Sequence, residues 1–182
     1  MKQVDLSTFN NQWYQPGSPI KRLLWYFINV VFFKSSCFPF YALKTFLLRL
    51  FGATVGKGVC IKPCVNIKYP WLLTIGDYVW IGEQVWIDNL AKVTIGNHVC
   101  ISQNALLLCG NHDYTSTQFD LIVKPIVIED GAWIGAQSTV CGGAHCATHT
   151  VVALGAVLVG DTTPYAIYKG NPAVKVKDRV IV

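Results

Sequence analysis

The stretch VGKGVCIKPCVNI, residues 55–67, places an aliphatic residue at every sixth position: Val55, Ile61 and Ile67. The spacing continues in steps of six, with two steps of eight and one interruption, through the anchors Ile75, Ile81, Ile87, Ile95, Ile101, Leu107, Ile128, Ile134, Val140, Cys146, Val152 and Leu158. A second apolar or small residue often follows four positions later, as at Val59, Val65, Val79, Val85, Ala91, Val99, Ala105, Ala132, Ser138, Ala144 and Ala156. A period of six matches neither the turn of an α-helix nor the alternation of a simple strand, so it indicates hexapeptide repeats.

A hexapeptide unit fits a short strand followed by a corner, with the anchor and the later small residue pointing inward. Three units make a triangular coil of eighteen residues, which the steps of eight enlarge at one corner after Ile67 and again after Ile87. Coils stacked about 4.8 Å apart bury a continuous apolar column and leave an open edge at each end. Glycines that follow anchors, such as Gly56 and Gly76, suit corner conformations that other residues resist. The sequence therefore predicts a mainly β fold, a parallel β-helix.

Length and composition indicate one domain, because 182 residues can bury a sizeable core and 52% of them are hydrophobic. The net charge is +5, and Lys and Arg cluster toward both ends without the interleaved pattern of a nucleic-acid face. We expect anionic small molecules or membrane surfaces as partners, and no nucleic acid. Seven cysteines without framework spacing predict reduced thiols and a cytoplasmic location.

Residues 1–52 are predicted to form a helical cap on one end of the coil. The apolar run LLWYFINVVFF, residues 23–33, is shorter than the roughly 20 residues needed to cross a bilayer, and no small-residue cleavage site of a signal peptide follows it. Residues 40–51 predict an amphipathic helix with Lys44, Thr45 and Arg49 on its polar face. Its predicted apolar face consists of Phe40, Leu43, Leu47, Leu50 and Phe51.

Two compatible interpretations apply to this N-terminal part. The helices either only cover the coil, or they also contact a membrane peripherally through an aromatic-rich face. The second interpretation depends on the flanking basic residues, which are Lys21, Arg22, Lys34, Lys44 and Arg49.

The repeats are interrupted by the segment CGNHDY at residues 109–114. Between Leu107 and Ile128 the register advances by twenty-one residues, which predicts a loop at about residues 108–125. An excursion from a rigid scaffold can carry a reactive side chain to a neighbouring subunit. This loop contains His112, one of only four histidines, although a lone histidine is more often structural than catalytic.

Several segments resemble one family. The repeats, the GNHDY interruption, IVIEDGAWIGAQSTV (residues 126–140) and GNPA (residues 170–173) are similar to the hexapeptide-repeat acyltransferases. The segments KRLLWYFINVVFF, LLRLFGATVGKGVCIKPCVNIKYPW and IGEQVWIDNLAKVTIGNHVCIS resemble more narrowly the colanic acid biosynthesis acetyltransferases of the WcaF type. The resemblance covers nearly the whole chain. It implies a left-handed coil over residues 53–182, a homotrimer, and acetyl-CoA as the acyl donor, with no metal.

The resemblance also implies site residues. The family's loop histidine falls on His112, which would take the proton of an acceptor hydroxyl as that hydroxyl attacks the thioester. A backbone N–H near Ala136 would stabilise the oxyanion, so that no acyl-enzyme is required. The positions where the family binds CoA along the coil are Trp133, Gly135, Ala136, Leu154 and Gly155, although Trp133 fits an interface residue equally well. Lys175 in the C-terminal tail would meet CoA phosphates, although it also fits a solvated tail.

Polar residues near the interruption are candidates for acceptor binding. Asp88 and Asn89 break an apolar coil, so they could bind sugar hydroxyls or could serve as corner residues. Asn111 and Asp113 flank His112 and could orient the loop or the imidazole, or could only stabilise a turn.

A metal site is the weaker alternative. Its candidates are Cys141, His145, Cys146 and His149, which are close in sequence. On the repeat register Cys146 points inward while the two histidines lie at outward positions, so the four cannot converge without distortion.

The sequence thus predicts an O-acetyltransferase that acts on a sugar hydroxyl of an exopolysaccharide or of its lipid-linked precursor. An amino sugar or an antibiotic as the acceptor, and a non-catalytic glycan-binding coil, are the alternatives.

Overall fold

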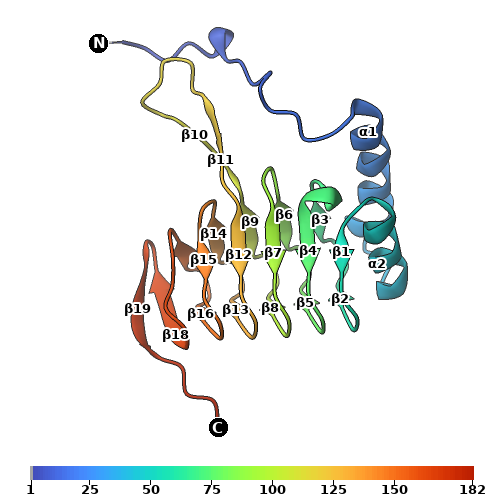
Figure 1. Cartoon of the computed structure of the whole chain (residues 1–182), viewed down its shortest axis with the longest axis vertical. Coiled ribbons are helices and arrows are strands. Elements are labelled where there is room, and N and C mark those ends of the chain that lie inside the picture. The colour runs from blue at the N-terminus through green and yellow to red at the C-terminus, as the bar shows by residue number, and fades with distance from the viewer. Residues whose placement is uncertain (1) are drawn as a thin grey trace.

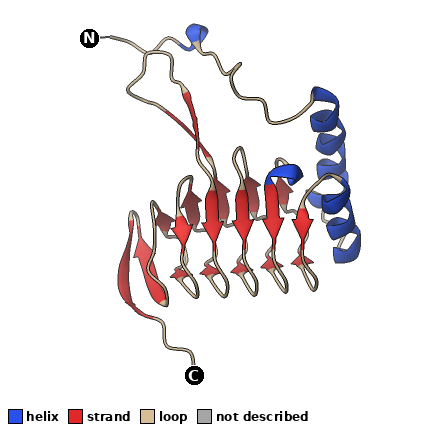
Figure 2. Ribbon diagram, viewed as in Figure 1, coloured by secondary structure: helices blue, strands red, loops and turns tan. Residues whose placement is uncertain are grey.

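The structure is a computed structural model that describes residues 2–182, and its main body is a parallel β-helix with three faces (Figures 1 and 2). The first face carries β1 (Thr54–Val55), β4 (Leu73–Ile75), β7 (Val93–Ile95), β12 (Ile126–Ile128) and β15 (His145–Cys146). The second carries β2 (Cys60–Ile61), β5 (Trp80–Ile81), β8 (Cys100–Ile101), β13 (Trp133–Ile134) and β16 (Val151–Val152). The third carries β3 (Asn66–Ile67), β6 (Trp86–Asp88), β9 (Leu106–Leu108), β14 (Thr139–Cys141) and β17 (Val157–Leu158).

The predicted anchors form the core of the coil. Every one of them is buried, with exposed fractions from 0% to 8%. Strand pairing places anchor on anchor, as Ile61 pairs with Ile81 and Ile81 pairs with Ile101. The register predicted from the hexapeptide spacing is therefore confirmed, and three interior columns of apolar side chains run along the coil.

Two different requirements act on the residues at the corners of the coil, a left-handed backbone and close stacking. A left-handed backbone recurs at two of the corners. One corner carries it at Gly58, Tyr78, His98, Gly131, His149 and Tyr165, and the other at Cys64, Gln84, Asn104, Gln137 and Gly155. Gly76, which directly follows an anchor, lacks a left-handed φ, so the predicted reason for glycine there is wrong. A Cβ on Gly76 would lie 2.7 Å from the carbonyl carbon of Gly96 in the next coil, so close stacking of the coils requires glycine.

Helices cover the N-terminal end of the coil, as Figure 2 shows. They are α1 (Pro19–Ile28), the π-helical turn η2 (Asn29–Phe33) and α2 (Tyr41–Leu50), and a 3-10 turn η3 (Pro70–Leu72) lies in the first enlarged corner. Ser18 caps α1, since its hydroxyl accepts from the Lys21 N–H at 3.3 Å and Pro19 occupies the first helical position. Gly52, with φ of 98°, follows α2 and directs the chain into β1.

The helices satisfy three carbonyl groups at the edge of the first coil. In later coils the anchor carbonyl accepts from the preceding coil, as Ile81 O does from the Lys62 N–H at 2.9 Å. Side chains replace that donor in the first coil, one for each face. Arg49 Nη2 donates to Val55 O at 2.9 Å, Lys44 Nζ to Ile61 O at 3.3 Å, and Trp25 Nε1 to Ile67 O at 2.8 Å.

This arrangement corrects the predicted orientation of α2. Lys44 is 1% exposed and its burial lowers the pKa of its ammonium group, whereas Phe40 and Leu50 are 63% and 65% exposed. Helical periodicity alone assigned Lys44 to the solvent face. The open carbonyl groups of the coil reverse that assignment, because an unpaired buried carbonyl is costly.

An antiparallel hairpin closes one face at the C-terminal end of the coil. β18 (Ala166–Gly170) pairs with β16 in parallel, and β19 (Ala173–Asp178) pairs with β18. Arg179 then fixes the tail, since its guanidinium donates to Gly131 O at 2.9 Å and to His149 O at 3.0 Å.

The predicted interruption is a second hairpin that projects from the corner between the third and first faces (Figure 1). It consists of β10 (Gly110–His112) and β11 (Leu121–Val123), paired antiparallel. Residues 2–17, which include the short turn η1 (Leu6–Thr8), run from α1 to this hairpin instead of joining the helical cap. A backbone hydrogen bond from Asp5 N to Thr117 O, 2.9 Å long, joins the two segments.

Candidate active site

The hairpin positions His112 at the end of its first strand. His112 pairs with Leu121, and Lys124 N donates to Cys109 O at 3.0 Å, so the base of the hairpin is closed by backbone hydrogen bonds. The side chain of His112 is half-buried between two aromatic rings. Phe119 stacks on the imidazole at 4.3 Å between ring centroids, and Phe9 of the N-terminal arm lies at 5.7 Å.

A hydrogen bond defines the tautomer of the imidazole. His112 Nδ1 lies 2.8 Å from the backbone oxygen of Phe119. A carbonyl oxygen can only accept, so Nδ1 carries the proton and Nε2 keeps a free lone pair in the neutral ring. The ring is therefore held with its basic nitrogen available, as a general base requires.

A cleft of about 530 Å³ lies beside His112. Its lining comes from four parts of the chain: the N-terminal arm, α1, the third-to-first corner of the coil, and the hairpin. The arm contributes Asn11, Gln12 and Gln15, whose amide groups can donate to and accept from sugar hydroxyls. Tyr14 holds the arm down, since its hydroxyl donates to Leu90 O at 2.5 Å.

The cysteine at the base of the hairpin, Cys109, is not a reactive thiol. Cys109, three residues before His112, is 1% exposed. Burial raises the pKa of its thiol to about 11, so little thiolate exists at neutral pH. Direct transfer, with no acyl group on this cysteine, fits these properties best.

The structure places Asp88 and Asn89 beneath the cleft. Asp88 is 6% exposed, and its Oδ1 lies 2.9 Å from Lys68 Nζ in an ion pair, although that oxygen has no hydrogen bond of ordinary geometry to the described residues. Asn89 is fully buried and makes two bonds with the backbone of Tyr69, accepting at 3.0 Å and donating at 2.6 Å. Asp88 thus holds Lys68, which lines the cleft, and Asn89 takes the corner role that the sequence left open.

Asn111 and Asp113 likewise hold local backbone. Asn111 is exposed, and its Oδ1 accepts from the His112 N–H at 2.8 Å. Asp113 Oδ1 accepts from the N–H and the hydroxyl of Thr115, and these bonds hold the pKa of Asp113 below its usual range. In the described chain the cleft lining includes none of the four residues predicted to bind the acceptor. Phe119, not Asp113, orients the imidazole.

Most of the predicted donor site comes together on the second face. Trp133, Gly135, Ala136 and Leu154 line one groove of about 430 Å³ between β13 and β16. The Trp133 indole Nε1 donates to the Ser102 hydroxyl at 2.9 Å and so lies across the preceding coil. The groove is mostly apolar, which suits the thin chain of a pantetheine arm.

Two other predicted donor contacts lie outside this groove. Gly155 is exposed at the same corner as Ala136, one coil later, and its N–H donates to Ala136 O at 2.9 Å. Lys175 is exposed on β19, where its ammonium group pairs with Asp178 at 2.8 Å, and the hydrogen bond to Asp178 raises the pKa of Lys175.

The residues considered for a metal site have other partners. His145 Nε2 lies 2.7 Å from Glu129 Oε1, and His149 stacks on Tyr165 at 4.7 Å between ring centroids. Within residues 2–182 no group of three or more His, Cys, Asp or Glu side chains could hold a metal ion.

The cleft and the groove share no lining residue and lie at different parts of the coil. The hairpin with His112 projects from the third-to-first corner, whereas β13 and β16 belong to the second face (Figure 1). The cleft beside His112 and the groove beside Trp133 therefore lie on separate surfaces of the chain.

Sequence reasoning missed several residues of the site. Ser102 accepts a hydrogen bond from the Trp133 indole, but the residues around it in the sequence form no motif that indicates this role. Phe119 has a left-handed φ of 54°, a conformation that no local motif announces for a phenylalanine. No local pattern marks the amides of the arm as site residues, because their position in the cleft depends on tertiary contacts.

The chain is similar to known acetyltransferases over most of its length. A protein of Escherichia coli strain K12 assigned as the colanic acid biosynthesis acetyltransferase WcaF is 39% identical over 177 residues, which are 97% of this chain and 97% of that protein. The galactoside O-acetyltransferase of the same strain is 26% identical over 129 residues, covering 69% of this chain and 64% of that enzyme. A hexapeptide-repeat acetyltransferase from Vibrio cholerae, solved in complex with acetyl coenzyme A, aligns with a TM-score of 0.79 at 26% identity, covering 89% of this chain and 88% of that one. No family model matches the sequence.

Proposed function

We propose that this chain, which belongs to the hexapeptide-repeat acetyltransferases and uses acetyl-CoA as its acyl donor, acetylates a sugar hydroxyl in exopolysaccharide biosynthesis. Its membership of the family follows from the similarity to WcaF along almost the whole chain. The sugar acceptor is supported by the activities assigned to the relatives, colanic acid biosynthesis and galactoside O-acetylation.

One observation carries the mechanism, the bond from His112 Nδ1 to Phe119 O. It directs the proton to Nδ1 and leaves Nε2 as the base. Nε2 removes the acceptor hydroxyl proton while the hydroxyl oxygen attacks the thioester carbonyl carbon of acetyl-CoA. The carbon–sulfur bond then breaks, and the imidazolium returns its proton to the departing thiolate, leaving an acetyl ester and free CoA.

The oxyanion of the tetrahedral intermediate needs a fixed donor. Ala136 lines the Trp133 groove, and its carbonyl is occupied by Gly155 N at 2.9 Å. Among the backbone hydrogen bonds of residues 2–182, none has the Ala136 N–H as its donor. We assign this N–H to the oxyanion.

The test is release of CoA thiol from acetyl-CoA in the presence of free sugars, nucleotide sugars and lipid-linked oligosaccharides. At least one saccharide should accelerate thiol release and gain one acetyl ester by mass. A metal chelator should leave the rate unchanged. Acceleration only by amines, with an amide as the product, would overturn O-acetylation.

The separation of the two half-sites leads us to propose a homotrimer in which the His112 cleft of one subunit faces the Trp133 groove of the next. Mixed assemblies of His112→Ala and Ala136→Trp chains test this, because each variant lacks a different half. Random assortment restores about a quarter of the sites if each site is shared between neighbours. Mixtures as inactive as the separate variants, together with a monomeric mass by light scattering, would contradict it.

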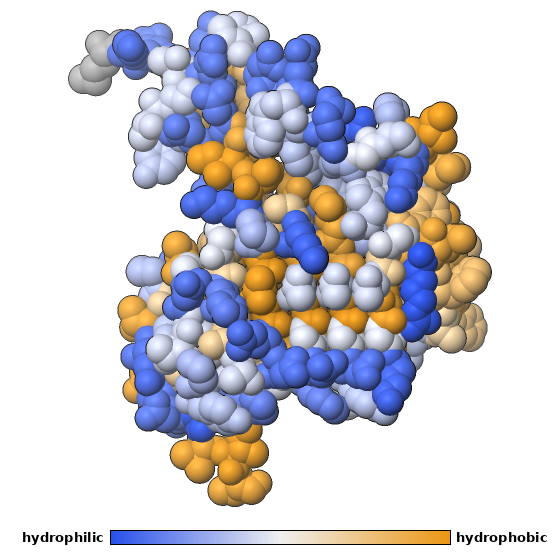
Figure 3. All heavy atoms as spheres, viewed as in Figure 1, coloured by the Kyte–Doolittle hydropathy of each residue, from blue (hydrophilic) through white to orange (hydrophobic). Residues whose placement is uncertain are grey.

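We further propose that the helical cap contacts the cytoplasmic surface of an anionic membrane. The outer face of the cap is apolar, with Ile20, Leu24, Phe27, Phe46 and Leu50 each more than half exposed, and Figure 3 shows this hydrophobic edge. No helix of the described residues is both long and apolar enough to cross a bilayer.

The basic residues contribute less than the sequence suggested. Lys44 is buried, Arg49 donates to backbone carbonyls, and the Lys21 ammonium group lies 4.5 Å above the Trp71 ring. Arg22 and Lys34 are the remaining cations of the predicted set, worth about 1 kcal/mol each near an anionic surface.

Sedimentation with phosphatidylglycerol vesicles should therefore capture the wild type, and salt should weaken this capture only modestly. Replacing Leu24 and Phe27 by Ser should abolish capture. A variant that still binds vesicles would exclude this face. If the substitutions instead reduce the size of the assembly, the face joins copies of the chain.

A further inference from the structure

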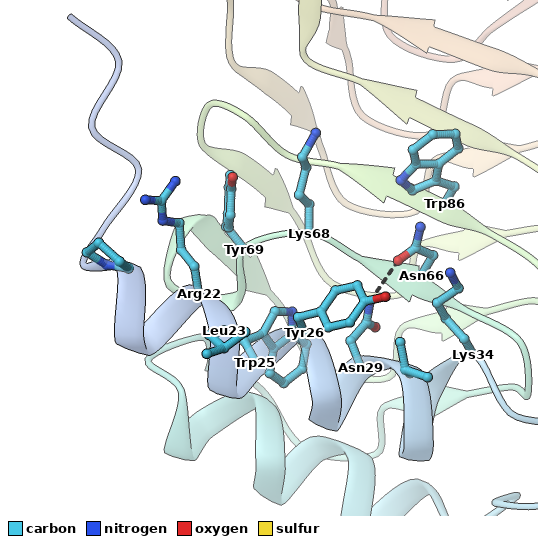
Figure 4. A pocket seen from close by; sticks show the side chains of 12 residues that line it. Arg22, Leu23, Trp25, Tyr26, Asn29, Lys34, Asn66, Lys68, Tyr69 and Trp86 are labelled. Carbon is cyan, nitrogen blue, oxygen red and sulfur yellow. Dashed lines mark hydrogen bonds between the residues drawn. The ribbon is translucent and has the colours of Figure 1, made fainter. Parts of the chain in front are cut away.

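A second hollow lies beside the His112 cleft, between α1 and the third face of the coil, and Figure 4 shows it. Its volume is about 510 Å³, similar to that of the cleft. Its walls come from α1 and η2 on one side and from β3, β6 and the following corner on the other. No step of the proposed acetyl transfer uses it.

The two cavities lie next to each other. Arg22, Lys68 and Tyr69 line both of them, so these three residues mark the junction. A molecule whose reacting hydroxyl lies at His112 can therefore extend past Arg22 and Lys68 into the second hollow.

The junction is cationic. Neither cavity is lined by an Asp or Glu, although Asp88 below Lys68 compensates part of its charge. Within residues 2–182 Arg22 forms no ion pair, and its guanidinium points toward the space between α1 and the coil in Figure 4. A guanidinium and an ammonium group that line the same two cavities suit a phosphate or diphosphate.

Beyond the junction the lining is mostly apolar and aromatic. Leu23 and Tyr26 from α1 and Val30 from η2 line this part together with Trp86 from β6. These four side chains are between 39% and 60% exposed, so the hollow is open along its length. Leu23 and Val30 also adjoin the exposed apolar residues of α1, which connects the hollow to the outer face of the cap.

We propose that this hollow is the carrier subsite of the acceptor, which binds a saccharide joined through a diphosphate to an apolar lipid chain. The diphosphate lies at Arg22 and Lys68, the lipid chain runs along Leu23, Tyr26, Val30 and Trp86, and the sugar reaches His112. The proposal rests on the proposed function, because it takes the sugar as the group that is acetylated.

Binding of surrogate ligands tests the subsite without any acetyl transfer. Farnesyl diphosphate, inorganic pyrophosphate, uridine diphosphate and farnesol are titrated calorimetrically against the wild-type protein, below the micellar concentration of each lipid. Farnesyl diphosphate should bind at least about tenfold more tightly than the other three, because it alone satisfies both the cationic junction and the apolar wall.

Matched variants separate the two contributions. Arg22→Gln should weaken farnesyl diphosphate and pyrophosphate binding by about tenfold each, whereas Lys57→Gln, at a distant corner, should weaken neither. Trp86→Ala should weaken farnesyl diphosphate by about tenfold and leave pyrophosphate unchanged. Trp80→Ala is its control, since Trp80 belongs to the same coil but points from the second face. Unchanged acetyl-CoA affinity confirms that each variant is folded.

Three results would overturn the inference: no binding of farnesyl diphosphate, binding that ignores Arg22, or uridine diphosphate binding equally tightly through Trp86. The last result would make the carrier a nucleotide. A free sugar acetylated efficiently by a protein that does not bind farnesyl diphosphate removes the subsite but keeps the proposed function. If farnesyl diphosphate binding depends on Arg22 and Trp86 but acetyl transfer does not depend on His112, the subsite is kept and the proposed function is removed.

Discussion

The His112 cleft and the Trp133 groove are assembled in different ways. The groove uses equivalent positions of successive coils, since Ser102, Gly135 and Ala153 each directly follow an anchor. The cleft joins an N-terminal arm, a helix, a corner and a hairpin that are far apart in the sequence. A repeat thus builds the groove from its own periodicity, whereas the position of His112, our proposed base, depends on segments outside the repeat. Substitutions in the two regions should therefore change different kinetic quantities.

The largest effect should follow removal of the base. His112→Ala should lower kcat by roughly 10²–10⁴-fold, because imidazole is the one side-chain type among the described lining residues whose ordinary pKa lies near neutral pH. The dissociation constant for acetyl-CoA should not change, since the groove shares no lining residue with the cleft. Steady-state kinetics and calorimetry check both expectations.

His98→Ala is the matched control for this variant. His98 stacks on Tyr78 at a corner, 5.3 Å between ring centroids, and should have near-wild-type turnover when it is replaced. If His112→Ala weakened acetyl-CoA binding as much as it slowed turnover, the two regions would not be separable.

The opposite result should follow when the groove is filled. Ala136→Trp places an indole in the space between β13 and β16 and should raise the dissociation constant for acetyl-CoA by about 100-fold. The control is Glu83→Trp, which substitutes the equivalent position two coils earlier, outside the groove. Unaltered acetyl-CoA binding by Ala136→Trp would show that the donor lies elsewhere.

A smaller effect should sharpen the role of the Trp133 indole. Trp133→Phe keeps an aromatic ring but loses the 2.9 Å hydrogen bond to Ser102. The KM for acetyl-CoA should rise by about two- to tenfold, the range for a single neutral hydrogen bond. Ser102→Ala should have a similar effect, and the double variant should add little to either. Full additivity in this cycle would mean that the bond does not position the indole.

The smallest effect is expected at Asp113, which holds a turn through Thr115, whereas His112 Nδ1 is bonded to Phe119 O. Asp113→Asn keeps the Oδ1 acceptor for Thr115 and should leave kcat within about threefold of wild type. The lowered pKa of Asp113 means that the folded hairpin favours the carboxylate. Its stabilisation is thus present above about pH 4 and is lost as the pH falls below that value.

Thermal unfolding between pH 3 and 6 should show this loss in the wild type and less of it in Asp113→Asn. An unchanged slope would mean that the turn contributes nothing at low pH. A large loss of kcat in Asp113→Asn would instead give this carboxylate a catalytic role.

The fold was predictable because the coil repeats one physical requirement. Each inward position must be apolar and each coil must stack on the next, so periodicity alone identified the anchors and the strand register. Resemblance to a family, and not the register, grouped Trp133, Gly135, Ala136 and Leu154, and they do line one groove. Resemblance to a family, and not periodicity, connected His112 with catalysis.

The remaining features depend on contacts that no local pattern encodes. Helical periodicity placed Lys44 in solvent, but the carbonyl groups of the first coil draw it inward. Residues 2–17 have no periodicity, and their path over the hairpin follows from tertiary contacts such as Asp5 with Thr117. Asn89 looked like a candidate for sugar binding because polarity in an apolar coil is the same signal for a ligand contact and for a buried backbone bond.

The three side chains that meet the first coil also determine how this protein would aggregate. Trp25, Lys44 and Arg49 occupy the acceptors that another polypeptide would need in order to add a strand there. If the helices detached, all three faces would expose an unpaired strand edge at once. Each edge would then have the same register as the strands of the inner coils. Such chains would join end to end as filaments, so mild heating that melts the helices before the coil should favour fibres over amorphous precipitate.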